Sequence, residues 1–471
     1  MKLLRHLWAV FDDRTGLSGL IGSALRHPVP RTRGWVGWAY VFGSATLFTF
    51  LLQVVTGIAL ATAYIPATGD AYQSIDFITH QATLGSWLRG IHNFGASAMI
   101  VLIGIHALRV FLMGSYKFPR EVSWLSGSVL LLLTLAMAFT GQLLRWDQSA
   151  FWSVVVAAAQ AGRAPFIGQQ LAHFILGGGT VGGATLSRFF SFHVFFIPAL
   201  IFAFLGGHLY LVLHSGISEP PQAGRPVDPQ TYRRWYGDLL KRDGVPFWPD
   251  AAWRDAIFGV AVIGIISALG LILGPPALGQ PPDPTLLQAD PRPDWYFLWY
   301  FAALALLPPG VEDWVIIGGP LVLGLLLFLL PLANRGERSP KRRPWAVGVA
   351  LLIVLLVGTL SVAGELSRWS PHFNTQVITS GVSGSPDSPL VRGAHLFNSK
   401  GCQACRAIGG NGGARGPDLT DVGLRLNHNQ LTTRILNGGG NMPAFANSLT
   451  PAELADLITF LMSRKGAGAG R

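Results

Sequence analysis

Charge is scarce in this chain of 471 residues: 13% of the residues are Asp, Glu, Lys or Arg, whereas 50% are hydrophobic. So little charge excludes an ordinary soluble protein and predicts a chain that crosses a membrane several times. Cysteine is scarcer still, with only Cys402 and Cys405. No second pair of metal ligands has the spacing of a structural zinc site, so zinc is not expected.

Acidic residues are fewer than basic ones, and the formal net charge is +11. This excess does not indicate nucleic-acid binding, because the basic residues concentrate in loops between apolar stretches, as in membrane proteins. The N-terminus also lacks the long apolar core and small-residue cleavage site of a signal peptide. We therefore expect residues 1–11 to form an amphipathic segment at the membrane interface.

Seven stretches are apolar and long enough to span a bilayer. They lie near residues 36–63, 92–113, 124–143, 190–213, 255–274, 314–332 and 345–364. Basic residues precede the first span and occur in the loops 109–121, 214–254 and 333–344, whereas the loop 66–88 has no Lys or Arg. The positive-inside rule therefore places the N-terminus in the cytoplasm and the end of the seventh span outside.

Two of these spans each contain a pair of histidines. His92 and His106 are 14 residues apart in the second span, and His193 and His208 are 15 apart in the fourth. A spacing of 14 is close to four helical turns, which puts both rings on one face, about 21 Å apart along the axis. One such pair alone is equally typical of satisfied core histidines. Two helices with a His near either end, however, can hold two haems with bis-histidine ligation.

Glycine pairs repeat this spacing in two other spans. Gly43 and Gly57 are 14 residues apart in the first span, as are Gly127 and Gly141 in the third. Small-residue helix packing explains either pair alone. The agreement of three helices favours flat macrocycles lying against the glycine backbone at two depths.

From about residue 8 to 364 the chain resembles cytochrome b of the cytochrome bc complexes. Beside the glycine and histidine pairs, the resemblance rests on Pro119-Arg-Glu121, Trp146-Asp-Gln148, Pro293-Asp-Trp-Tyr296, Phe247-Trp-Pro-Asp250, Pro282-Asp-Pro284 and Arg342-Arg-Pro344. The 15-residue histidine gap is similar to the chloroplast type, whose two halves are separate proteins but are continuous here. That type carries an extra haem on a Cys where this chain has Val41, so no third haem is expected there.

The resemblance implies a ligand pair for each of two haems b: His92 with His193 near the outer face, and His106 with His208 near the inner face. Arg89, one helical turn before His92, would meet a haem propionate.

Quinone sites follow from the same resemblance. The Pro-Asp-Trp-Tyr motif implies quinol oxidation, with Asp294 able to take a proton beside Tyr296. On its own, this motif is also consistent with a proline-led turn. The family usually has Glu in place of Asp294, and the Asp form resembles some menaquinol-using complexes. His214 resembles a histidine of the quinone-reduction site.

Past a linker rich in Ser, Gly and Pro, the chain becomes polar enough for a small soluble domain. Cys402 and Cys405 form a C-x-x-C motif, Met442 lies in an Asn-Met-Pro motif, and a closing helix is expected from Pro451 to about Met462. This part resembles a class I cytochrome c. The resemblance implies thioether links from the two cysteines to a haem c, with Met442 as the distal iron ligand.

One position departs from the cytochrome c pattern. The family needs His after C-x-x-C as the proximal iron ligand, but Arg406 stands there. Arginine stays protonated and has no lone pair for iron. Three interpretations remain open: a haem-less relic whose cysteines are reduced or paired, a haem with His395 or His428 as substitute ligand, or a single mutation or sequence error in a working cytochrome c.

These patterns predict an all-α protein, a polytopic membrane helix bundle followed by a small cytochrome c-like domain. The expected parts are a four-helix di-haem half (1–218), a three-helix half with the quinol-site loop (219–364), a linker (365–388), the cytochrome c-like domain (389–464) and a disordered tail (465–471).

The leading functional hypothesis is the redox subunit of a quinol:cytochrome c oxidoreductase in a bacterial inner membrane, with the C-terminal domain on the periplasmic side. The resemblance implies a proton-translocating Q cycle, a Rieske iron–sulfur protein, a downstream cytochrome or oxidase, and a homodimeric complex. Two alternatives are a haem-bearing membrane anchor that links quinone to another redox module, and a non-redox scaffold with a vestigial outer domain.

Overall fold

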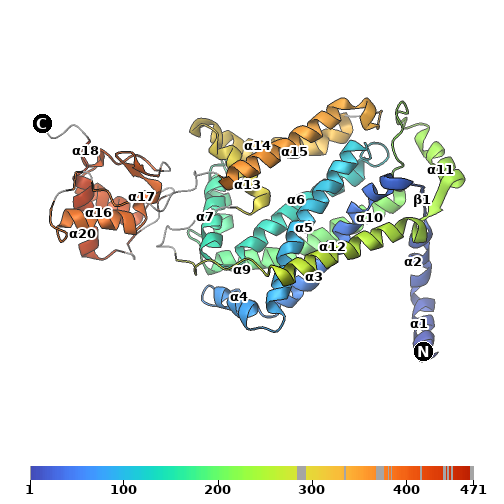
Figure 1. Cartoon of the computed structure of the whole chain (residues 1–471), viewed down its shortest axis with the longest axis horizontal. Coiled ribbons are helices and arrows are strands. Elements are labelled where there is room, and N and C mark those ends of the chain that lie inside the picture. Colours follow the sequence, from blue (N-terminus) through green and yellow to red (C-terminus); the bar gives the residue numbers. More distant parts are fainter. Residues whose placement is uncertain are drawn as a thin grey trace. The chain divides into compact units, whose positions relative to one another are not determined.

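The computed structural model of the chain is mostly helical (Figure 1). It describes residues 2–283, 293–333, 336–366, 376–379, 381–382, 384–413, 416–438, 442, 445–446 and 449–466. Parts of four predictions lie outside these residues: Pro284 of the Pro-Asp-Pro motif, Asn441 and Pro443 beside Met442, the linker centre 367–375, and the tail from 467 onward. The chain divides into two compact units. The first consists of residues 1–144, 186–278 and 318–358, and the second of residues 145–185, 279–317 and 359–471.

Among the described residues, seven helices are long and apolar enough to cross a membrane, as the sequence predicts. They are Gly34–Ala61, Gly85–Leu112, Glu121–Leu143, Gly183–Ser215, Phe247–Ile272, Val311–Leu332 and Pro344–Leu366. The second and fourth begin at Gly85 and Gly183, several residues before their apolar stretches. Hydropathy marks only the apolar part of a helix, whereas backbone hydrogen bonds continue through the polar residues at its end.

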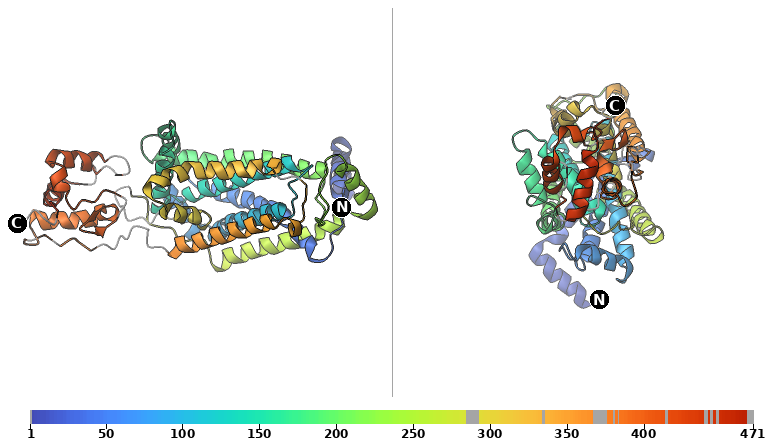
Figure 2. Two further views of the ribbon diagram at one scale, coloured as in Figure 1. Left: turned by 90° about the horizontal axis from the view of Figure 1, so that it is seen from above. Right: turned by 90° about the vertical axis from the view of Figure 1, so that its left-hand side faces the viewer.

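Four long helices of the first unit contain the predicted haem residues. They are α3 (Phe42–Ala61), α5 (Gly85–Leu112), α6 (Glu121–Leu143) and α10 (Ile197–Ser215), the last preceded by the π-helical turn Phe192–Phe196. Helix α3 packs against α5, α6 packs against α10, and α12 (Ala252–Ile272) packs against both α3 and α5. These helices run alongside one another in both directions of view (Figures 1 and 2).

A buried apolar cluster lies at mid-length in the four-helix part. Its members are Phe50 on α3, Met99 on α5, Leu130 on α6, and Ile197 and Ile201 on α10. Each of these residues falls in sequence between the two glycines or the two histidines of its helix. The apolar cluster therefore separates two levels of candidate site residues along the helices.

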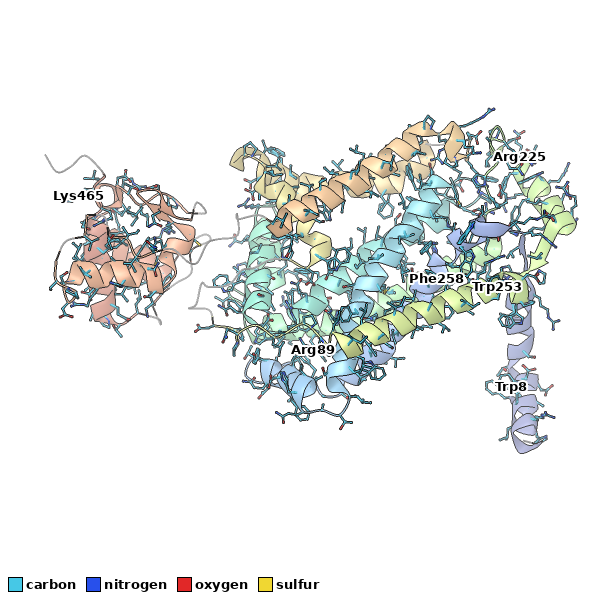
Figure 3. All side chains as sticks on the ribbon, in the orientation of Figure 1. Trp8, Arg89, Arg225, Trp253, Phe258 and Lys465 are labelled. Atoms are coloured by element: carbon cyan, nitrogen blue, oxygen red, sulfur yellow. The ribbon has the colours of Figure 1, made fainter. Side chains whose placement is uncertain are left out.

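Further helices and one strand pair precede the C-terminal domain. The helices are α1 (Lys2–Thr15), α2 (Leu17–Arg26), α4 (Ala71–His80), α7 (Gln148–Gly162), α8 (Gly168–Leu176), α9 (Gly183–Ser191), α11 (Tyr232–Asp243), α13 (Trp295–Ala305), α14 (Pro309–Ala333) and α15 (Pro344–Leu366). Strands β1 (Pro28–Pro30) and β2 (Gly244–Pro246) pair antiparallel. Helix α1 leaves Leu7, Trp8 and Phe11 about half exposed, and Figure 3 labels Trp8 on it. Such a face is typical of a helix that lies on a membrane surface.

The C-terminal domain contains α16 (Pro389–Ser399), α17 (Cys402–Cys405), α18 (Val422–Arg425), α19 (His428–Asn437) and α20 (Pro451–Met462), with the short pair β3 (Ala407–Ile408) and β4 (Asn411–Gly412). Helix α20 begins with a capping box between Thr450 and Glu453 and with Pro451 at its first position. It packs on α16, where Phe397 and Phe460 are fully buried. The predicted closing helix is therefore confirmed.

Candidate haem and quinone sites

The rings of His92 and His193 face each other across the first unit. Their centroids are 6.2 Å apart and their planes are nearly perpendicular, at 81°. A metal–imidazole bond is about 2 Å long, so one iron between two imidazoles puts the ring centres about 6 Å apart. The spacing of this pair therefore fits bis-histidine ligation of a single haem iron.

Hydrogen bonds determine which nitrogen of each ring can reach a metal. His193 Nδ1 lies 3.0 Å from the Met137 carbonyl oxygen, which only accepts, so this nitrogen carries the proton. His92 Nδ1 lies 2.9 Å from Thr56 Oγ1, whose own proton is donated to the Leu52 carbonyl. The Thr56 oxygen therefore accepts from His92, and Nε2 is left as the ligating atom in both rings.

In the second pair, His208 and His106 differ in whether the Nδ1 atom has a hydrogen-bond partner. His208 Nδ1 lies 2.9 Å from Ser126 Oγ, and that hydroxyl donates to the Ser123 carbonyl, so His208 also presents Nε2. His106 Nδ1 is buried and has no hydrogen-bond partner in the part of the chain that the structure describes.

A π-helical turn explains the unequal histidine spacings. His193 lies within the turn Phe192–Phe196, inside the continuous helix Gly183–Ser215. A π-turn accommodates one extra residue without shifting the helix faces beyond it. The 15-residue gap to His208 is therefore equivalent to the 14-residue gap between His92 and His106, and both ligands lie on one face.

Each predicted glycine lies against one imidazole. A methyl group would stand 3.2 Å from His92 Cε1 if placed on Gly57, and 3.0 Å from His106 Cε1 if placed on Gly43. The distances are 3.3 Å to His208 for Gly127 and 2.5 Å to His193 for Gly141. The missing side chains therefore make room for the four ligand rings. The sequence interpretation placed the macrocycle itself against these glycines, which remains a prediction.

Sequence reasoning missed the hydroxyl groups that orient the histidines. Thr56, Ser126 and Thr140 each immediately precede one of the glycines, and each lies within hydrogen-bond distance of a ring Nδ1. The signal was present as a repeated Thr-Gly or Ser-Gly pair at the glycine spacing. It was not recognised because contacts between neighbouring helices are invisible in one sequence.

Arg89 is buried near the start of α5 (Figure 3). Its Nη1 donates to Thr79 Oγ1 and its Nη2 to the Pro276 carbonyl, each at 2.9 Å. The guanidinium therefore links α4 to the segment after α12. Its predicted contact with a haem propionate remains a prediction.

The predicted quinol-oxidation residues meet at the start of α13. The Tyr296 hydroxyl donates to Asp294 Oδ2 at 2.7 Å, and Asp294 does not use its carboxylate to cap the helix. Burial, with the adjacent Asp294 carboxylate as a further cause, raises the pKa of the Tyr296 phenol above its ordinary value. The phenol thus keeps its proton and donates it in this hydrogen bond, which the Asp294 carboxylate accepts.

The Trp-Asp-Gln motif anchors the loop that precedes Asp294. Asp147 is buried and caps α7 by accepting from Ala150 N at 2.8 Å, while its other oxygen accepts from Gly279 N at 3.2 Å. Gln148 exchanges two hydrogen bonds with the Asp283 backbone, at 2.7 and 2.9 Å. This motif therefore fixes residues 279–283 against α7.

His214 lies in the last turn of α10, where its ring is exposed and stacks on Tyr210 at 5.8 Å. The end of this helix is held by Arg120 of the Pro-Arg-Glu motif. Arg120 donates to the Gly216 carbonyl and to the Tyr232 hydroxyl, both at 2.8 Å.

In the C-terminal domain, Arg406 Nη2 lies 3.2 Å from Met442 Sδ. The predicted distal ligand is therefore in contact with the residue that replaces the proximal one. Burial raises the pKa of the neighbouring Cys402 thiol to about 12, although the Arg406 guanidinium opposes the rise. The substitute ligands proposed from the sequence, His395 and His428, are both exposed.

Comparisons with known proteins identify the family of this chain. Family models match three segments: "Cytochrome b/b6/petB" residues 30–216, "Cytochrome b(C-terminal)/b6/petD" residues 282–381, and "Cytochrome C oxidase, cbb3-type, subunit III" residues 388–461. Cytochrome b of Allochromatium vinosum is 32% identical over 341 residues, which cover 69% of this chain and 81% of that protein. The chain belongs to the cytochrome b family. The cytochrome bc complex cytochrome b subunit of Chlorobaculum thiosulfatiphilum is 34% identical over 369 residues, 76% of this chain and 81% of its own.

A solved structure has the same fold as this cytochrome b. A chain of a hyperthermophilic respiratory complex III superposes with a TM-score of 0.65 at 25% sequence identity, covering 76% of this chain and 91% of that chain. The chain is thus a cytochrome b with a cytochrome c domain fused at its C-terminus, and the family implies haem b. The histidine pairs fit that group. A haem c does not fit the C-terminal domain in the same way, because Arg406 cannot ligate iron.

Proposed function

We propose that this cytochrome b is the redox subunit of a quinol:cytochrome c oxidoreductase, and that it carries electrons between two membrane levels. The observation that carries the proposal is the His92–His193 pair, 6.2 Å apart with both Nδ1 atoms engaged. Two haems b, held at this pair and at His106 with His208, would supply the one-electron steps. The apolar cluster between the levels excludes water from the path.

Quinol oxidation is assigned to the region of Asp294. Its carboxylate accepts a proton from the quinol, while Tyr296 keeps its own proton and orients the acceptor through their 2.7 Å hydrogen bond. Asp147 and Gln148 hold residues 279–283 against α7, on the sequence side that leads to Asp294. Quinone reduction is assigned to the region of His214, which is exposed in the last turn of α10.

The orientation and partners belong to the same proposal. Basic loops place the N-terminus and His214 on the cytoplasmic side of a bacterial inner membrane, with the Asp294 region outside. Protons are then released outside and taken up inside. A Rieske iron–sulfur protein would accept the first electron, and a downstream cytochrome or oxidase would follow in a dimeric complex.

Optical spectra of membranes that contain the full chain test the proposal. We expect two b-type signals in reduced-minus-oxidised spectra, of which His92→Leu removes one and His106→Leu removes the other. His173→Leu on α8 is the matched control and should retain both. Loss of the same signal in both ligand variants, or of neither, would contradict the assignment. Asp294→Asn should retain both signals and lose most quinol oxidation.

A further inference from the structure

At three of the four glycines, the residue immediately before the glycine places a hydroxyl beside a histidine ring. At the fourth glycine, Gly43, it does not. Thr56, Ser126 and Thr140 place a hydroxyl beside the Nδ1 of His92, His208 and His193, at 2.9, 2.9 and 3.2 Å respectively. Because Gly43 and Gly57 lie on the same helix, 14 residues apart, the residue before Gly43 occupies the equivalent position toward His106. That residue is Phe42.

Phe42 offers no acceptor. Its ring instead packs edge-on against Phe258 of α12, with centroids 5.4 Å apart; Figure 3 labels Phe258. The nearest serine or threonine in sequence, Ser44, donates to the Val41 carbonyl at 2.9 Å. Among the described residues, His106 Nδ1 has no hydrogen-bond partner, although the atom is buried. Helix α3 thus orients His92 through the Thr56 hydroxyl but offers no hydroxyl to His106.

We infer that the acceptors beside each Nδ1, among them the residue before the glycine, set the donor strength of the adjacent histidine, and that Phe42 makes the His106–His208 haem the easier of the two to reduce. A ligand imidazole that donates its Nδ1 proton becomes more basic and stabilises the ferric state. The His92–His193 site has two such rings, whereas the His106–His208 site has one. The inference rests on the proposed haem ligation, and it favours electron transfer from the first site to the second.

Redox titration of the full chain in membranes, followed at each b-type signal, measures this effect. Phe42→Thr supplies the missing acceptor and should lower the reduction equilibrium constant of the His106–His208 haem about threefold to tenfold. For one electron this is a shift of about 30 to 60 mV to lower potential. Ser126→Ala should shift the same signal by a similar factor in the opposite direction, and Thr56→Val should raise the other signal.

Thr49→Val is the matched control. Thr49 is buried on the same helix and donates to the Ala45 carbonyl at 2.9 Å, just as Thr56 donates to the Leu52 carbonyl. Among the described residues, no hydrogen bond joins Thr49 to a histidine. Neither signal should move in this variant. The inference is overturned if Phe42→Thr leaves the potential unchanged, or if Thr49→Val shifts it as much. If Phe42→Thr fails to assemble, unchanged potentials in Ser126→Ala and Thr56→Val overturn it. Absence of two b-type signals in the unmodified chain overturns the proposed function instead.

Discussion

Gly141→Ala provides the most direct test of how the ligand rings are packed. The added methyl group would stand 2.5 Å from His193 Cε1 and 3.1 Å from both ring nitrogens. Carbon atoms in good contact are about 3.5 to 4.0 Å apart, so the ring must move by about 1 Å. That movement disturbs the hydrogen bonds of His193 Nδ1 to the Met137 carbonyl and to Thr140.

The cost of this displacement can be estimated. Overpacking of a close-packed site costs about 1 to 3 kcal/mol, and the disturbed hydrogen bonds place Gly141→Ala near the upper end. A loss of about 2 to 3 kcal/mol corresponds to about 30- to 150-fold weaker haem retention. For alanine at the other glycines, the loss of haem should decrease as the distance from the added methyl group to the histidine Cε1 increases. Gly43 comes next at 3.0 Å, then Gly57 at 3.2 Å and Gly127 at 3.3 Å.

Haem content per purified chain and the two b-type signals are the readouts. Gly141→Ala should lose the signal of the His92–His193 site and keep the other. Gly104→Ala on α5 is the control, because a methyl group there meets nothing within 4 Å. Equal haem loss in Gly104→Ala, or full retention of both signals in Gly141→Ala, would refute the packing argument.

Three further predictions concern other parts of the chain. Arg406→His should make the C-terminal domain stain for covalent haem on a denaturing gel, in a host that attaches haem c. The control Arg425→His, at an exposed site, should not produce this staining. Staining of the unmodified chain would contradict the role given to Arg406. Asp147→Ala should lower quinol oxidation with both b-type signals intact, since it removes the α7 cap and frees residues 279–283; unchanged turnover would count against this anchor. Thr450→Ala should destabilise the C-terminal domain by about 1 kcal/mol in denaturant unfolding, through loss of the capping box on α20; an unchanged midpoint would argue against it.

The resemblance to cytochrome b required no coordinates. Long apolar runs specify membrane helices because backbone groups in a bilayer must be satisfied within each segment. Histidines inside such runs are costly and therefore informative. The seven spans and the closing helix α20 are confirmed, and the family follows from motifs that stand in order along the chain.

The pairing of residues across helices could not be read from the chain. The glycine spacing alone did not show that Gly57 faces His92 and Gly43 faces His106, because helix rotation and neighbour choice are set by packing. The π-turn at His193 likewise depends on hydrogen bonding that hydropathy does not record. In the sequence, the spacing between the two histidines is one residue longer in the fourth span than in the second. The π-turn at His193 accommodates that extra residue.

Composition and motif spacing thus determine that this is a helical membrane protein with paired histidines at two levels, since both properties reside in the order of residues along single helices. Tertiary structure decides which ring nitrogen is available, because the acceptors Thr56, Ser126 and Thr140 come from other helices than the histidines they orient. It also reveals that Phe42 leaves His106 without such an acceptor. A hydrogen bond between distant residues exists only once packing has brought its donor and acceptor within about 3 Å.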